Sequence, residues 1–107
     1  MWITADVHYA AALHYDPSRA VTKDFLPFWE FVAGPLHAGN FGPNAIDPTF
    51  GPEVKYQSAQ PGGPQNRPPS EGYQYFGTLT IDGGSGRLSA ELFDAAGERL
   101  YGVDLDP

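Results

Sequence analysis

Residues 73–107, YQYFGTLTIDGGSGRLSAELFDAAGERLYGVDLDP, decide the fold class of this chain. Apolar side chains alternate along three runs of this stretch, which is the period of a β-strand with one buried face. Two hairpin-like turn signals, Gly83–Gly86 and Asp94–Gly97, separate the three runs. We therefore predict an antiparallel β-meander. Its apolar face holds Tyr73, Tyr75, Leu79, Ile81, Leu88, Ala90, Leu92, Tyr101, Val103 and Leu105.

The whole chain has 107 residues and a formal charge of −7, from thirteen Asp and Glu against six Lys and Arg. This length suits one small domain, 1–107, with a modest core. The acidic balance argues against nucleic-acid binding, which relies on clustered cations. No apolar run approaches the ~20 residues of a bilayer span, so we expect no membrane partner. Cysteine is absent, which excludes disulfides and thiolate metal sites. No signal segment opens the chain, and its localisation is left open.

The first segment, residues 2–12, reads WITADVHYAAA. Its β-branched and aromatic residues, with no breaker among them, predict one extended strand. On such a strand Asp6 and His8 lie on the same face, because the side-chain period is two.

The second segment, residues 24–34, reads DFLPFWEFVAG. We predict a short helix that begins after an Asp24 cap, accepts Pro27 in its first turn and ends at Gly34. The helix is apolar on nearly all sides, so we expect it to be buried. Glu30 is its only acid and needs hydrogen-bond partners there.

The third segment, residues 35–72, holds eight of the eleven prolines and is predicted to be a long loop. Its second half is polar and is expected to be mobile. The fold class that follows is mainly β with one short buried helix: an N-terminal strand, then a long loop, then the antiparallel meander.

The pattern Asp6-x-His8 is the sharpest chemical signal in the chain. A carboxylate and an imidazole that converge on one point suit Zn, Mn or Fe. A structural hydrogen-bonded pair is the alternative reading of so short a motif. His14 and His37 are the other histidines, and they complete a metal site only when the loop with His37 folds back. Arg19 and Lys23 are candidates for contact with an anionic substrate.

Four stretches, TADVHYAAALHYDP, FWEFVAGPLHAGNFGP, IDPTFGPEV and GYQYFGTLTID, occur in this order along the chain. Together they closely resemble the C-terminal end of alkaline phosphatase D-like (PhoD-like) metallophosphatases of the calcineurin-like metallophosphoesterase superfamily. The resemblance implies a layered β-sandwich and hydrolysis of phosphate esters by a metal cluster. It also implies that Asp6 and His8 are metal ligands. Members of this family are usually exported.

The family's earlier metal motifs have no counterpart here, so the chain is expected to carry a fraction of the cluster. One hypothesis is a hydrolase of small phosphoesters that uses a divalent or trivalent ion (Zn, Mn, Fe or Ca). His14 and His37 then serve as further ligands or proton carriers, and a homo-oligomer, with a dimer favoured, completes the site. The other hypothesis is a truncated, non-catalytic C-terminal module that is structural or binds a partner.

Overall fold

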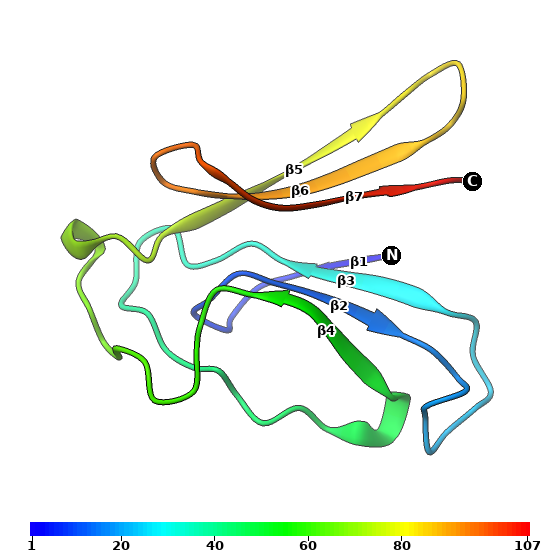
Figure 1. Ribbon diagram of the computed structural model, residues 1–107, viewed down its shortest axis with the longest axis horizontal. Coiled ribbons are helices and arrows are strands. Elements are labelled where there is room, and N and C mark those ends of the chain that lie inside the picture. Colours follow the sequence, from blue (N-terminus) through cyan, green and yellow to red (C-terminus); the bar gives the residue numbers. More distant parts are fainter.

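The fold consists of seven β-strands in two sheets (Figure 1). The structure is a computed structural model, and it describes all residues, 1–107. The first sheet has the order β1-β3-β2-β4, with β1 Trp2–Thr4, β2 Ala11–Tyr15, β3 Phe28–Val32 and β4 Pro52–Gln57. The second sheet has the order β5-β6-β7, with β5 Tyr75–Ile81, β6 Leu88–Asp94 and β7 Arg99–Leu105. Helical structure is limited to two 3₁₀ turns, Pro48–Phe50 and Pro69–Glu71, so no helix is long and apolar enough to cross a membrane.

The predicted meander is confirmed. Strands β5, β6 and β7 pair antiparallel in chain order, with Leu79 opposite Ala90 and Ala90 opposite Val103. The alternation read from the sequence places Ala90 and Leu92 on the buried face, together with Tyr75. The local sequence pattern was sufficient to predict this sheet, because one of its faces is directed to the core and the other to solvent.

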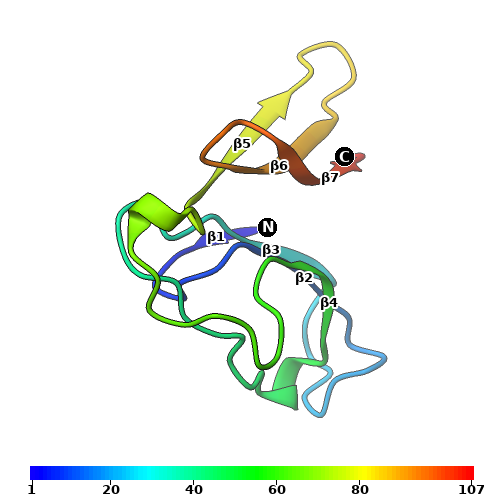
Figure 2. The same ribbon diagram turned by 60° about the vertical axis from the view of Figure 1, so that its left-hand side comes forward.

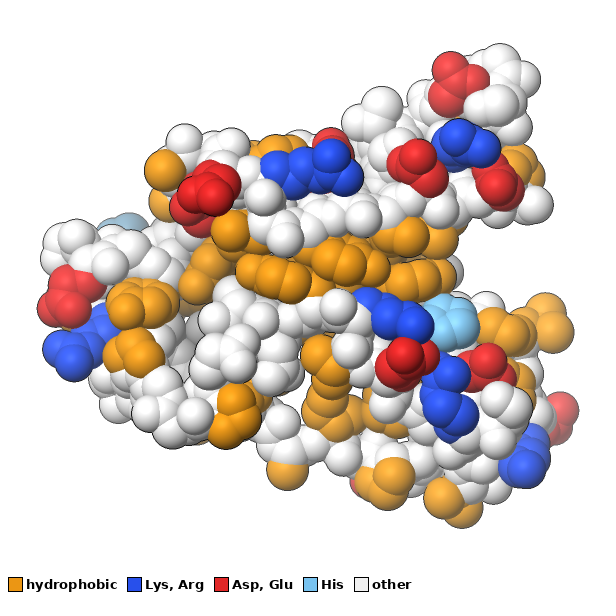
Figure 3. Space-filling view, viewed as in Figure 1, with side chains coloured by type: hydrophobic (Ala, Val, Ile, Leu, Met, Phe, Trp, Pro, Cys, Tyr) orange, Lys and Arg blue, Asp and Glu red, His pale blue; other side chains and the backbone are white.

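The two sheets pack face to face as separate layers, and residues 58–74 carry the chain from one layer to the other (Figure 2). Between them lies a core of Ala10, Ala12, Phe31, Tyr75, Ala90 and Leu92. From the side, apolar side chains form a band along the gap between the layers, and most charged side chains lie outside it (Figure 3). Burial of these apolar groups is the main force that holds the layers together.

The predicted helix over 24–34 is wrong. Phe28–Val32 forms strand β3 instead, and Asp24 is exposed in the segment before it. Strand β3 is paired on both edges, parallel with β1 and antiparallel with β2. A central strand reads as a continuous apolar run, just as a buried helix does. The five-residue length and the aromatic and β-branched residues favour the strand.

The predicted strand over 2–12 is also wrong as one element. It breaks after Thr4 and resumes at Ala11, so Asp6 and His8 lie in the connection and not on a strand. Asp6 adopts a positive φ of 78° at this break, which is the left-handed region that Asp tolerates better than most residues. Both Thr4 and Ala11 are register partners of Val32, so the connection crosses the end of β3.

The predicted long loop over 35–72 is interrupted by β4, which pairs antiparallel with β2. The second half of this segment, which was expected to be mobile, makes hydrogen bonds with amide side chains. Asn40 donates from Nδ2 to Pro64 O at 2.6 Å, and its Oδ1 accepts from Arg67 N at 2.8 Å. Gln65 donates from Nε2 to Gly42 O at 2.6 Å. These long-range bonds replace regular structure in satisfying the loop backbone.

Candidate functional site

The candidate site lies at the carboxyl ends of β1 and β3, the only parallel pair in the two sheets. Thr4 ends β1 opposite Val32, which ends β3. The residues that follow each strand, 5–8 and 33–36, line one shallow pocket of about 260 Å³. Ligand sites in α/β proteins are also built at the carboxyl ends of parallel strands, because the loops that leave them converge. The fold therefore brings Asp6 and His8 to one pocket, although no continuous strand carries them.

Asp6 is the exposed acid of this pocket. It takes part in none of the six ion pairs of the chain. Its left-handed backbone costs of order 1–2 kcal/mol in an L-residue. Backbone strain of this kind is frequent at functional sites. The carboxylate is thus available to a cation from solvent.

His8 is half-buried and is oriented by the backbone. Its Nδ1 lies 2.6 Å from Gly39 O. A carbonyl oxygen only accepts, so Nδ1 carries a proton, and in the neutral ring Nε2 is then the nitrogen with a lone pair. Metal-binding histidines are commonly fixed in this way, with the second ring nitrogen donating to a carbonyl or carboxylate. His8 therefore fits the role of a ligand through Nε2.

His14 lies elsewhere, near the far end of β2, where it pairs with Trp29 of β3 and Glu53 of β4. Its ring lies 4.9 Å from that of Trp29, and Arg19 Nη2 is 3.5 Å from its Nδ1. Arg19 in turn forms an ion pair with Glu53 at 3.1 Å. His14 is thus part of a charged cluster at the end of the first sheet opposite the pocket of Asp6 and His8.

His37 and Lys23 are exposed, and neither lines that pocket. Nowhere in the chain do three His, Asp or Glu side chains lie close enough to hold a metal ion. The four-ligand arrangement considered from the sequence is therefore not assembled within this chain. A structural zinc site takes four protein ligands and a catalytic one takes three. Asp6 and His8 alone are fewer donors than either kind of site takes, although a carboxylate and an imidazole are donor types that such sites use.

A second pocket of about 200 Å³ lies on the other side of His8. Buried Asn40 and half-buried Ser58 line it, and Ser58 Oγ accepts from Ala10 N at 2.9 Å. Ser58 holds the backbone two residues after His8, and Asn40 holds the loop of Pro64 and Arg67. Their partners are distant in the chain, so no local sequence pattern predicts these contacts.

Glu30 is the centre of a separate polar cluster on the outer face of the first sheet. Thr4 Oγ1 donates to its Oε1 at 2.6 Å, and Tyr15 Oη donates to its Oε2 at 2.5 Å. This confirms that the lone acid of the apolar segment needs partners. Burial of the phenol, followed by the bond to Glu30 and its negative charge, raises the pKa of Tyr15.

Tyr15→Phe tests this cluster through its alkaline pH dependence. In wild type the raised pKa keeps the folded phenol protonated where the unfolded phenol ionises, so stability from this group is complete below about pH 10 and is lost as the pH rises beyond it. We expect urea unfolding between pH 8 and 11 to show a smaller alkaline loss of stability in the variant. An identical alkaline slope in both proteins would contradict the assignment.

Comparison with known proteins identifies the family of this chain. The model of the PhoD-like phosphatase family matches residues 1–92, which include the pocket, strands β1 to β5 and most of β6. Neither a search of curated proteins nor a search of solved structures finds a match to the chain. The family match covers most of the 107 residues, and it includes Asp6 and His8. The chain belongs to the PhoD-like phosphatase family.

Proposed function

We propose that Asp6 and His8 form one part of the metal centre of a hydrolase that acts on small phosphoesters. Membership of a phosphatase family, whose members are generally metal dependent, supports this function. The observation that carries it to these residues is their meeting in one pocket, with His8 held by Gly39 so that Nε2 is free. The acid and the imidazole suit Zn, Mn or Fe, while Ca is the oxygen-preferring alternative.

Each residue has a defined part in this proposal. Asp6 contributes negative charge and oxygen donors that are open to solvent, and His8 contributes a nitrogen whose orientation is fixed before a metal arrives. The fixed ring lowers the entropy that binding costs. A bound metal ion supplies Lewis acidity toward a phosphoryl oxygen and lowers the pKa of a water molecule.

The remaining ligands come from outside this pair, and a second copy of the chain is the source that we propose. His14 and His37 lie outside the pocket of their own chain, so the proton-carrier role predicted for them requires that they reach it from the second copy. Variants His14→Ala and His37→Ala separate that role from ligation: a proton carrier loses turnover and keeps the metal, whereas a ligand loses both.

The experiment is metal titration and hydrolysis on the same sample. The full chain, freed of metal with chelator, is titrated with zinc or manganese, and bound metal is counted after gel filtration. Hydrolysis of bis(p-nitrophenyl) phosphate and of p-nitrophenyl phosphate is then followed with and without EDTA. We expect stoichiometric metal and EDTA-sensitive hydrolysis of at least one ester.

The alternative is a non-catalytic module, and the observation on its side is that no three His, Asp or Glu side chains of one chain gather at a common point. Folded protein that binds no metal, hydrolyses neither ester and keeps its unfolding midpoint in EDTA would establish that alternative. Metal binding without hydrolysis would retain the ligand assignment and remove the catalytic one.

A further inference from the structure

Strand β5 is an unprotected edge of the second sheet. Its seven residues, Tyr75–Ile81, contain no charged residue and no proline. It pairs only with β6, and its other side is free. Natural edge strands are normally blunted by lysine, proline or a bulge, because an open edge pairs with other chains. The register between β5 and β6 has no bulge.

The free hydrogen-bonding groups of this edge can be assigned to residues. Asp82 N donates to Arg87 O at 2.9 Å, so even-numbered residues of β5 direct their backbone groups toward β6. The odd-numbered residues direct theirs to the open side, where Tyr75 N already bonds to Pro35 O at 2.9 Å. Gly77, Leu79 and Ile81 therefore present three unpaired N–H groups in an alternating row.

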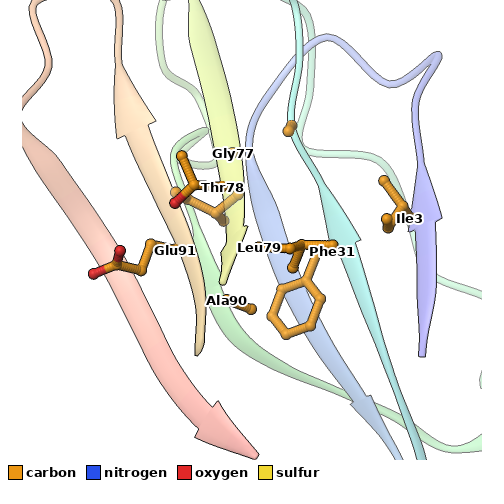
Figure 4. Close-up of a pocket in the computed structure, with 9 residues that line it drawn as sticks. Ile3, Phe31, Gly77, Thr78, Leu79, Ala90 and Glu91 are labelled. Carbon is orange, nitrogen blue, oxygen red and sulfur yellow. The ribbon is translucent and has the colours of Figure 1, made fainter. Parts of the chain in front are cut away.

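An apolar groove of about 250 Å³ runs beside this edge, between the two sheets (Figure 4). Phe31 of β3 lies between Leu79 of β5 and Ile3 of β1 in this view. Leu79 and Ile3 remain 41% and 65% exposed. A strand added to β5 covers this groove with its inward-facing side chains, because opposite residues in an antiparallel pair share a face.

The chain also exposes more surface than its mass predicts. Its accessible surface is 6474 Å², whereas a compact monomer of 11.6 kDa exposes about 5,800 Å². Its radius of gyration is 14.6 Å, against about 13 Å for a compact domain of this length. The excess approaches the roughly 800 Å² that each partner contributes to a standard interface.

We propose that a second copy of this chain pairs with β5 about a two-fold axis at Leu79. The two Leu79 residues then face each other, and Gly77 of each copy faces Ile81 of the other. In this register the free backbone groups of Gly77, Leu79 and Ile81 are paired in both copies. The hydrogen bond from Tyr75 N to Pro35 O is kept. Thr78 meets Thr80 of the second copy, which is a favourable cross-strand pair. The large Ile81 side chain covers the place where Gly77 has none.

The absence of charge on β5 favours a second copy as the occupant. The chain carries a net charge of −7, so two copies repel unless they meet along an uncharged surface. Because the same edge of each copy pairs with the other, the assembly is complete with two copies and neither β5 edge stays open. The proposed function also draws on a second copy, but the two proposals are tested on different residues: cross-linking and hydrogen exchange report on β5, whereas metal titration reports on Asp6 and His8.

Cross-linking of a single cysteine tests the axis, because the chain has no cysteine of its own. We expect Leu79→Cys to cross-link with a short bis-maleimide at a rate on the order of tenfold or more above Leu26→Cys, since pairing raises the local thiol concentration to the millimolar range. Leu26 is 85% exposed and lies far from β5 in the sequence, so it is the matched control. Sedimentation equilibrium of wild type should show a dimer.

Ile81→Lys provides a variant that folds readily, because Ile81 is 69% exposed in the single chain. We expect it to be monomeric, while Leu26→Lys stays dimeric. Hydrogen exchange should protect the amides of Gly77, Leu79 and Ile81 in wild type only. A monomeric wild type, equal cross-linking at positions 79 and 26, or a dimer in which these amides exchange freely would overturn the proposal. The last result would mean that another surface forms the dimer.

Discussion

Asp6→Asn and His8→Ala are each expected to abolish stoichiometric metal binding and, with it, phosphoester hydrolysis. Asparagine keeps the size of Asp6 and removes the charge, whereas alanine removes the only nitrogen donor of the pocket. Loss of an outer-shell partner alone costs roughly 10–100-fold in metal affinity or activity. We therefore expect loss of a direct ligand to exceed a hundredfold, measured by metal titration and by ester hydrolysis on the same preparation.

Asp24→Asn is the control for this experiment, because Asp24 is exposed and lies outside the pocket. It makes the same chemical change and should leave metal content and activity as in wild type. Circular dichroism of all three variants checks that the sheets are intact. Full metal occupancy in folded Asp6→Asn and His8→Ala would show that the metal is bound elsewhere.

Leu92→Ala is expected to cause a large loss of stability. Leu92 lies on the central strand of the second sheet and is the most deeply buried large side chain of the core, with 2% exposed. Three of the six buried residues in its core cluster are alanines, and larger side chains such as Trp29 and Tyr101 pack around them while partly exposed. A buried Leu→Ala change costs about 2–5 kcal/mol. A domain of this size has a total stability of about 5–15 kcal/mol.

Urea unfolding followed by circular dichroism measures this loss directly. Leu26→Ala is the matched control, because the same truncation of an exposed side chain should change stability by less than about 0.5 kcal/mol. A loss below about 1 kcal/mol for Leu92→Ala would mean that the layers do not pack through this residue.

The two halves of the chain differed in how well their sequences predicted structure. The meander was readable because alternation, turns and pairing are all local within residues 73–107. The segment around Phe31 was not readable, since a five-residue apolar run fits both a buried helix and a central strand. What made it a strand was pairing with β1 and β2, and β1 precedes it by more than twenty residues.

The sequence pointed to two residues that the structure brings to one pocket, but it did not predict the backbone path that places them there. Asp6 and His8 were identified from their chemistry, and the structure places them in one pocket. A shared strand face does not bring them together, because the strand breaks between Thr4 and Ala11. The bond from His8 to Gly39 spans 31 residues, and no local signal identifies it.

The sequence by itself determined the antiparallel meander, the mainly β class and the acid and imidazole of the site, because each depends on residue types and short spacings. Only the tertiary structure decided that residues 28–32 are a strand, that residues 5–8 cross the end of that strand, and that His14 lies away from the pocket. These features depend on contacts between distant segments. Their free energy comes from burial and pairing that no short stretch of sequence contains.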